Sequence, residues 1–290
     1  MEFGTERNHG KIRVRVCPRF VTPTSPEVLV TGGTGVLGSL VVDRLLARGH
    51  RVRLLSRTGG ADEVPGVRRV RGDLRASSRL EEVTQGLEAI VHCASATRAV
   101  TSRRRREVDV LGTRRLLDAA REQGSPHVVY PSIVGIDGHP LDYYRTKRAG
   151  EEEVEASGLP WSVLRTTQFH ELLLQGLGAL AHLPVLPVPR GWRFQPVSAA
   201  EVADHLVELV STGEPHGRAD DLGGPEVIDA VDVARTYLGA AGQRRRVVTL
   251  PFPGRVAESF RQGRQLCPGC RTGRVTWGEF LQERTARYRR

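Results

Sequence analysis

The sequence predicts an α/β fold, in which a doubly wound parallel sheet carries a smaller C-terminal substrate lobe. Three observations lead to this class. Strand-like and helix-like segments alternate between residues 28 and 166, which is typical of a parallel sheet covered on both faces. A glycine-rich turn joins the first strand to the first helix. A chain of 290 residues with 39% hydrophobic content suffices for one large domain with a smaller lobe.

Each element of the sheet domain has its own signal. Residues 28–31 are an apolar run and predict the first strand, and the apolar-periodic segment 36–48 predicts a helix that ends at Gly49, a typical C-cap. Further apolar runs predict strands at 51–56, 67–71, 89–93, 127–130 and 161–164, and amphipathic segments predict helices at 77–84, 105–122 and 142–156. We expect the helix over 105–122 to bury the stripe Val108, Leu111, Leu116, Leu117 and Ala120.

The alternation loosens past Thr166. Helices are predicted at 169–181, 199–210, 229–238 and 277–288, and prolines interrupt the chain up to Pro196. We therefore expect a Rossmann-type dinucleotide-binding domain over residues 27–168 and a small substrate-binding lobe over residues 169–290. Residues 1–26 lack the apolar core of a secretory signal and predict a mobile N-terminal extension. The apolar segment 172–188 is broken by glycines and prolines, which argues against a membrane partner.

The turn after the first strand is the most informative motif. It reads Thr31-Gly32-Gly33-Thr34-Gly35-Val36-Leu37-Gly38. Its glycines fit both G-x-G-x-x-G and G-x-x-G-x-x-G, and the motif has the preceding strand and following helix that dinucleotide binding requires. Such a turn lets the backbone approach a pyrophosphate, while the N–H groups of the first helical turn face the anion. The alternative is an ordinary glycine-rich turn between a strand and a helix.

Tyr143 and Lys147 form a Y-x-x-x-K pair on a predicted helix and therefore share one helix face. A neighbouring ammonium group would lower the pKa of the Tyr143 hydroxyl from about 10, so that it could give a proton to a carbonyl oxygen. Lys147 is the only lysine after Lys11, and it could also bond the nicotinamide ribose. Ser132, just past the fifth strand, could hold the substrate oxygen beside Tyr143. The alternatives are a chance spacing on an exposed helix and a turn serine.

Four further segments complete a resemblance. They are Leu55-Ser56-Arg57, Gly72-Asp73-Leu74, His92-Cys93-Ala94-Ser95 and Leu164-Arg165-Thr166-Thr167-Gln168-Phe169. Together with the glycine turn and the Y-x-x-x-K pair, they resemble the short-chain dehydrogenase/reductase superfamily in its extended-to-atypical branch. The subgroup that they resemble most is that of the NmrA-like NAD(P)H-binding proteins. The resemblance covers residues 27–215 well and the remainder thinly.

The resemblance implies a role for each segment. The residues expected at the cofactor are Asp73 and Leu74 for adenine, Ala94, Ser95 and Ala96 for the ribose and pyrophosphate, and Thr167, Gln168, Phe169 and His170 for the nicotinamide and substrate. The chain departs from the family pattern in two places: the segment after the fourth strand is not Asn-Ala-Ala-Gly, and Pro131 precedes the serine. Members of this branch also include regulators that bind the cofactor without turnover.

The end of the second strand predicts the choice of cofactor. A site that prefers NAD places an acidic residue there, to bind the ribose 2′-hydroxyl. This chain has Ser56 and Arg57 instead, with no acidic residue before Asp62. A guanidinium group suits a 2′-phosphate. We therefore expect NADP(H) to be preferred and NAD(H) to be possible, with Arg57 as the discriminating residue; the alternative is an arginine that points to solvent.

The net charge of +10 favours an arginine-rich surface rather than a nucleic-acid binder. All but two of the 43 basic residues are arginine, and the chain contains no zinc finger, no basic region followed by heptads and no aromatic RNP pattern. We expect no nucleic-acid partner, and we interpret the basic run over residues 103–106 as a solvated face. The resemblance implies a homodimer, because helices after the fourth and fifth strands commonly form a dimer interface in the extended branch.

The four cysteines are expected to be reduced and incidental. Only Cys267 and Cys270 form a C-x-x-C motif, and a structural zinc site needs a second pair of ligands. The redox form of this motif usually lies near an early βαβ unit, whereas this one is close to the C-terminus. This cysteine usage favours a cytoplasmic protein.

Three functions remain open. The first is an NADPH-dependent oxidoreductase that acts on a carbonyl, alcohol or enone of a small organic molecule, with Tyr143 as the acid/base, Lys147 tuning it and Ser132 orienting the oxygen. The second is a regulator that senses NADP(H) and signals through a partner protein. The third is an epimerase that uses the cofactor without net redox change. The apolar character of the lobe up to about Ala199 favours a hydrophobic substrate.

Overall fold

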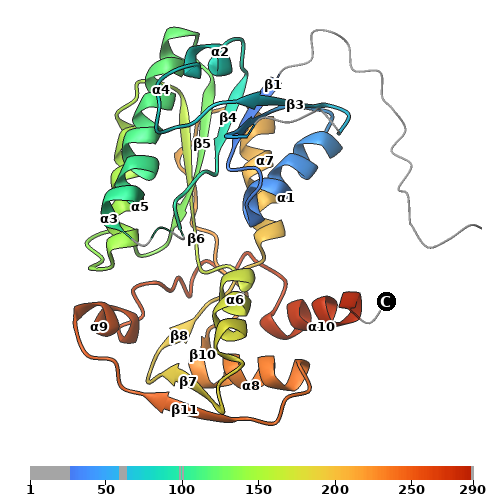
Figure 1. Cartoon of the computed structure of the whole chain (residues 1–290), viewed down its shortest axis with the longest axis vertical. Helices are drawn as coiled ribbons and strands as arrows, with labels where there is room; N and C mark the ends of the chain where they lie inside the picture. The colour runs from blue at the N-terminus through green and yellow to red at the C-terminus, as the bar shows by residue number, and fades with distance from the viewer. Residues whose placement is uncertain (1–26, 59–63, 98, 100, 289–290) are drawn as a thin grey trace, which may run out of the picture.

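A computed structural model gives the architecture of residues 27–58, 64–97, 99 and 101–288. Figure 1 shows a helix-covered sheet in the upper part of the view and a lobe below it. The expected N-terminal extension over residues 1–26 lies outside the described residues. Among the helices that the structure describes, none has both the length and the apolar character needed to cross a bilayer.

Seven parallel strands form the main sheet, in the order β3-β2-β1-β4-β5-β6-β9. Their bounds are β1 Glu27–Thr31, β2 Arg51–Ser56, β3 Val67–Arg71, β4 Ala89–His92, β5 His127–Ile133, β6 Trp161–Thr166 and β9 Gly217–Arg218. The strand order reverses between β1 and β4, and ligands bind at the carboxyl ends of strands next to such a reversal. The predicted doubly wound α/β class is confirmed.

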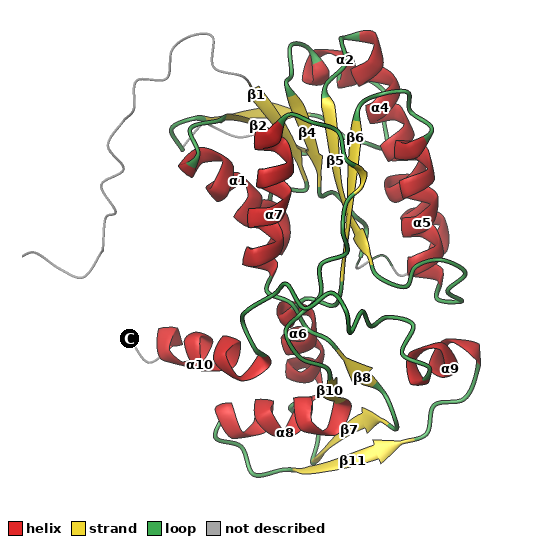
Figure 2. Cartoon of the chain, turned by 180° about the vertical axis from the view of Figure 1, so that it is seen from behind, coloured by secondary structure: helices red, strands yellow, loops and turns green. Residues whose placement is uncertain are grey.

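Helices cover both faces of this sheet (Figure 2). They are α1 Val36–Ala47 and α7 Ala199–Thr212 on one face, and α2 Leu80–Thr84, α4 Thr113–Glu122 and α5 Asp142–Glu155 on the other. Because successive strand residues point to opposite faces, Val30 packs with α1 and α7, whereas Leu29 packs with the opposite helices. Both are fully buried, which explains why β1 appears as an uninterrupted apolar run in the sequence.

The segment predicted as one helix over 105–122 is not regular. It consists of α3 Ser102–Arg106, a π-helical turn η1 Glu107–Gly112 and then α4. The wider π turn rotates the following residues about the helix axis. In this segment Asp109 and Val110 are buried, whereas Val108 and Leu111 are only half-buried. The expected stripe is therefore wrong at Val108 and Leu111.

The lobe has a hydrophobic core of its own, which includes Leu186, Val233 and Trp277. Its elements are α6 His170–Leu180, β7 Val185–Pro189, β8 Arg193–Phe194, β10 Ile228–Asp229, α8 Ala230–Ala240, β11 Arg246–Leu250, α9 Arg255–Arg261 and α10 Trp277–Tyr288. The strand β7 pairs in parallel with β11, and β8 pairs antiparallel with β10. The sequence did not predict these strands, because prolines within β7 argue against a strand and are tolerated here at an edge.

The chain enters the lobe and then returns to the sheet. The helix α7 packs against α1, and β9 pairs with β6 beyond the other strands. A bridge between Thr166 and Leu222 continues this pairing. The lobe is therefore built from two segments, one on either side of residues 197–222, and the expected single boundary at residue 168 does not separate it from the sheet.

Candidate functional site

The glycine turn lies at the carboxyl end of β1 and has no room for side chains at two positions. Gly32 has a φ of +69°, and a Cβ atom there would lie 2.7 Å from the backbone N and Cα of Ala94. A Cβ atom on Gly38 would lie 2.3 Å from the carbonyl oxygen of Gly32. The N-cap of α1, Gly35, supplies no side-chain cap, and the first turn has no acidic residue. This end of α1 therefore fits an anion such as a pyrophosphate.

A chain of hydrogen bonds fastens the end of β1 to β4. The Thr31 hydroxyl accepts from the N–H of Ala94 (3.1 Å) and donates to Nδ1 of His92 (2.6 Å). The Thr113 hydroxyl donates to the carbonyl oxygen of Asp109 (2.9 Å) and accepts from Nε2 of His92 (2.9 Å). Burial lowers the pKa of His92 to about 3, so the imidazole is neutral and can take this tautomer.

Asp109 holds the loop that follows β4. Its carboxylate accepts hydrogen bonds from the N–H of Ala96 (2.7 Å) and the hydroxyl of Ser95 (3.3 Å), two residues expected at the cofactor. Burial raises the pKa of Asp109. Sequence reasoning missed this residue. A signal was present, because Asp109 precedes Thr113 by four and Leu116 by seven, and an acid on the core face of a helix is unusual.

Tyr143 lies at the start of α5 and reaches across to the loop after β4. Ser95 lies close enough to influence the pKa of the Tyr143 hydroxyl, and burial raises that pKa to about 12. The expectation that Lys147 lowers this pKa is therefore wrong, because burial dominates and the lysine is engaged elsewhere. A tyrosine with this pKa keeps its proton at neutral pH.

Lys147 is buried and points to the end of β5 instead. Its ammonium donates to the carbonyl oxygen of Pro131 (2.8 Å) and lies 3.8 Å from the centre of the Tyr130 ring. Burial lowers its pKa to about 8, so the group is still mostly charged at neutral pH. Contact with the ring face adds a cation–π interaction to the hydrogen bond. Lys147 thus joins α5 to the strand that carries Ser132.

Ser132 lies within β5 rather than just past it, because the strand continues to Ile133. Its side chain is buried, and its Oγ has no hydrogen-bond partner among the residues that the structure describes. Leaving a buried hydroxyl unpaired costs about 1–3 kcal/mol. An unpaired hydroxyl at the carboxyl end of a parallel strand is therefore suited to a ligand oxygen.

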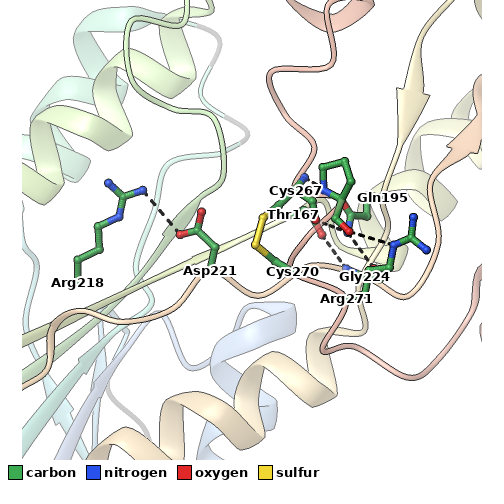
Figure 3. Close-up of a disulfide and its surroundings, with 9 residues drawn as sticks. Thr167, Gln195, Arg218, Asp221, Gly224, Cys267, Cys270 and Arg271 are labelled. Atoms are coloured by element: carbon green, nitrogen blue, oxygen red, sulfur yellow. Dashed lines mark hydrogen bonds and ion pairs between the residues drawn. A yellow bond between two sulfur atoms is a disulfide. The ribbon is translucent and has the colours of Figure 1, made fainter.

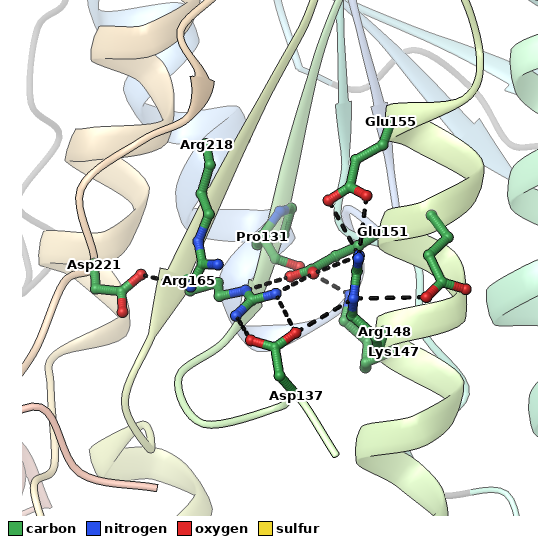
Figure 4. A network of polar contacts seen from close by, with 10 residues as sticks. Pro131, Asp137, Lys147, Arg148, Glu151, Glu155, Arg165, Arg218 and Asp221 are labelled. Carbon is green, nitrogen blue, oxygen red and sulfur yellow. Dashed lines mark hydrogen bonds and ion pairs between the residues drawn. The ribbon is translucent and has the colours of Figure 1, made fainter. Parts of the chain in front are cut away.

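A buried ion network sets the position of α5 (Figure 4). Arg165 of β6 donates from Nε and Nη2 to the Glu151 carboxylate, at 2.9 and 2.6 Å, and both side chains are almost completely buried. Arg165 also bonds Asp137 in the loop before α5. Arg148 donates to Glu151 from the solvent side (3.2 Å). Because Glu151 is on the same helix as Tyr143 and Lys147, this network fixes all three against the sheet.

The residues expected at adenine lie near the ends of β2 and β3. Hydrogen bonds from Arg75 lower the pKa of Asp73, and the charge of Arg57 contributes. Arg57 itself is exposed, next to Ser56 at the end of β2. The side chain of Leu74 is buried in the core under α2 and α4.

The segment after β6 connects the sheet to the lobe. Thr167 accepts through Oγ1 from the N–H of Gly224 (3.2 Å), and Gln168 donates to the carbonyl oxygen of Gln265 (2.9 Å). Phe169 precedes α6 and packs against the sheet core. The structure places His170 in the lobe core, stacked on Phe280 with ring centres 4.8 Å apart, and burial lowers its pKa to about 4.

Two expectations about charge and cysteines need correction. Arg105 forms an ion pair with Asp142 and donates to the carbonyl oxygen of Ala99 (2.6 Å), so this member of the basic run is structural rather than solvated.

Cys267 and Cys270 form a disulfide, so the expectation that they are reduced is wrong (Figure 3). The tight turn over these residues, closed by a hydrogen bond from the N–H of Cys270 to the carbonyl oxygen of Cys267 (2.9 Å), brings the two sulfurs together.

Comparison with known families shows to which family this chain belongs. A sequence model of the NAD(P)H-binding family matches residues 32–212, which is more than half of the chain. The chain belongs to the NAD(P)H-binding family. Within it, its relatives identify an extended, NmrA-like short-chain dehydrogenase/reductase, as the motifs indicated.

This short-chain dehydrogenase/reductase has relatives with named activities. Short-chain dehydrogenase/reductase family 42E member 1 of Mus musculus is 32% identical over 199 residues, which are 58% of this chain and 50% of that protein. The chain thus spans half the length of this relative. The ceramide reductase of Caulobacter vibrioides is 29% identical over 249 residues, which are 81% of this chain and 77% of that protein.

A short-chain dehydrogenase/reductase of Agrobacterium tumefaciens with bound NAD has a similar structure. It aligns with a TM-score of 0.70 over 91% of this chain and 97% of that one, at 22% identity. At this identity the likeness establishes the fold alone. The family match establishes an NAD(P)H-binding protein.

Proposed function

We propose that this protein is an NADPH-dependent oxidoreductase that transfers hydride to or from a carbonyl, alcohol or enone of a small, hydrophobic organic molecule. The observation that carries this proposal is the half-buried, protonated Tyr143, whose pKa is influenced by Ser95 on the loop beside the glycine turn. A proton donor therefore lies near residues expected along the cofactor. The open helix end at Gly35 and the unpaired Ser132 hydroxyl fit a dinucleotide and a substrate oxygen, respectively.

The chain's own groups have distinct roles in this proposal. The nicotinamide supplies the hydride when it is bound. Tyr143, with a pKa of about 12, gives its proton to the oxygen as negative charge develops there. Ser132 donates a hydrogen bond to the same oxygen, and Lys147 adds a positive charge behind the strand. Asp109 holds Ser95 and Ala96 in the loop that we expect along the cofactor.

A cluster of aromatic rings supports the hydrophobic substrate. The Tyr144 ring lies 6.2 Å from that of Tyr143 and 4.3 Å from that of His139. Phe260 of α9 stacks on Trp192 at 4.3 Å and meets His139 edge-on at 5.3 Å. These rings extend from the tyrosine into the lobe, and the name of the ceramide reductase relative agrees with a lipid-like substrate.

The test of catalysis is Tyr143→Phe, with Tyr237→Phe on the lobe helix α8 as the matched control. We expect NADPH consumption, measured on a panel of hydrophobic ketones, enones and quinones, to be lost in Tyr143→Phe and kept in the control. Calorimetry should show NADPH affinity within about twofold of the parent in both. Retained turnover in Tyr143→Phe would contradict the assignment. NADPH binding without consumption by the parent protein would favour the sensor, and conversion of a sugar nucleotide without net consumption would favour the epimerase.

The preference for NADPH rests on Arg57. This exposed guanidinium lies close enough to Asp73 to influence its pKa, on the side of the site expected to hold adenine. We expect Arg57→Ala to weaken NADPH binding roughly tenfold to a hundredfold, the value of a charge-assisted bond, and to leave NADH binding unchanged. Parallel calorimetric titrations measure both, with the exposed Arg235→Ala as control. An unchanged ratio of the two affinities would remove Arg57 from the proposal.

A further inference from the structure

The disulfide between Cys267 and Cys270 has no role in the proposed hydride transfer. Several hydrogen bonds nevertheless fix the turn that carries it. Both cysteines are half-buried at the end of the sheet domain nearest the lobe, close to the segments that follow β6 and β9 (Figure 3). Arg271 donates to the carbonyl oxygen of Pro268 (3.1 Å) and closes the outer side of the turn. A half-buried position leaves the sulfurs within reach of a small external thiol.

The turn that carries the disulfide is bonded to the body of the protein through one side chain. Gln195 accepts from the N–H of Cys267 (2.8 Å) and donates to its carbonyl oxygen (2.9 Å). The same amide group donates to the carbonyl oxygen of Gly224 (2.9 Å). Because Gln195 holds the backbone of Cys267 on both sides, breaking the S–S bond would not release this residue from its place. The two sulfurs would stay near each other in the reduced state.

A carboxylate lies beside the sulfurs. An oxygen of Asp221 and the two sulfur atoms all lie within 4.8 Å of one another. Asp221 has an ion pair with Arg218, at 3.7 Å, and its side chain is 25% exposed. A carboxylate in this position can take a proton from a thiol, and a thiol must lose its proton before its sulfur can attack another sulfur.

We propose that Cys267 and Cys270 are a reversible thiol–disulfide exchange site for external dithiols, in which Asp221 accepts and returns the thiol proton. In the reductive direction, a thiolate of the dithiol attacks one sulfur, the Cys267–Cys270 bond breaks and a mixed disulfide forms. The second thiolate of the dithiol then displaces the bound sulfur. The chain gains two electrons and two protons, and the external dithiol becomes a disulfide. In the oxidative direction, Asp221 removes the proton from the attacking thiol.

The first experiment equilibrates the whole protein in mixtures of reduced and oxidised dithiothreitol, quenches with acid, alkylates, and maps the thiols on peptides by mass spectrometry. We expect Cys267 and Cys270 to change together in one two-electron transition. Cys93 is the internal control, because burial raises its thiol pKa to about 12 and it should resist alkylation before unfolding. A pair that stays reduced or stays oxidised in every mixture would overturn the proposal. Stoichiometric zinc in the purified protein, released when both thiols are alkylated, would also overturn it.

The second experiment tests Asp221 by the rate at which the reduced pair reoxidises, as a function of pH. We expect Asp221→Asn to slow reoxidation at neutral pH at least about tenfold, which is less than a positioned base supplies in an enzyme because Asp221 is partly exposed. The loss should disappear at alkaline pH, where the thiols ionise without help. The exposed neighbour variant Asp220→Asn is the control. Equal rates in the two variants at neutral pH would remove Asp221 from the site.

Discussion

Glu151→Gln tests whether the buried ion network holds α5 in place. The carboxylate of Glu151 is fully buried and takes two hydrogen bonds from Arg165 and one from Arg148. The substitution keeps the volume of the side chain, so no cavity is created. It removes the negative charge that compensates a guanidinium of which only 2% is exposed. The remaining partner of Arg165, Asp137, is largely exposed and compensates it poorly.

The magnitude follows from the burial of the pair. Removing one partner of a buried ion pair costs about 3–5 kcal/mol, and we expect about 3 kcal/mol because Asp137 stays bonded. In a chain of this size that loss corresponds to a fall in Tm of roughly 6–12 °C. The matched control is Glu152→Gln on the same helix. Glu152 is 60% exposed and lies 3.6 Å from Arg148, so its loss should cost less than about 1 kcal/mol.

Urea unfolding followed by circular dichroism measures both variants, with calorimetric NADPH titration as a second readout. Glu151→Gln should unfold at a lower urea concentration and bind NADPH more weakly, because α5 carries Lys147. Glu152→Gln should change neither value appreciably. If the two variants unfold at the same urea concentration, the network does not fix α5 and the reasoning fails.

Three further predictions concern single residues. Gly38→Ala should weaken NADPH binding at least about tenfold in calorimetry, because its Cβ would meet the carbonyl oxygen of Gly32, whereas Gly176→Ala, with open space around it, should not. Ser132→Ala should raise the urea midpoint, because it removes a buried hydroxyl without a partner, and should abolish NADPH consumption; a lower midpoint would indicate a structural role. The folded pKa of His92 lies below its unfolded value, so the unfolded state binds more protons and stability falls as pH drops from about 6.5 toward 3. His92→Gln should reduce that slope by up to about 1.4 kcal/mol per pH unit in urea titrations.

The sequence predicted those parts of the fold whose signals are local. The strand β2 and the helix α10 have the bounds that their apolar patterns indicated, and the order of the elements was enough to derive a doubly wound sheet. The π turn at Asp109 was not predictable from periodicity, because one wider turn leaves the composition of a helix unchanged. The pairing of β7 with β11 depends on residues about sixty positions apart, and no local pattern records it.

The candidate site divides in the same way. The glycine turn was predictable because all of its residues lie next to one another in the sequence, between a strand and a helix. The helical spacing placed Tyr143 and Lys147 on one helix, but it carried no information on burial. Burial raises the pKa of Tyr143, and Lys147 bonds the carbonyl oxygen of Pro131. The partners of Asp109 and of Arg165 come from distant segments and required the folded chain.

The two-segment lobe has a mechanical consequence. Three stretches of chain cross between lobe and sheet side by side: the N–H of Thr167 donates to the carbonyl oxygen of Leu222 (3.0 Å), and the N–H of Val197 donates to that of Gln168 (2.9 Å). The lobe is therefore joined to the sheet by three adjacent, hydrogen-bonded stretches, which hold it more firmly than a single linker would. Gln195 lies in one of these stretches and also bonds Cys267. The disulfide is therefore fastened to the connection between the sheet and the lobe, so a change at the sulfurs would act directly on the part of the chain that sets how the two sit together.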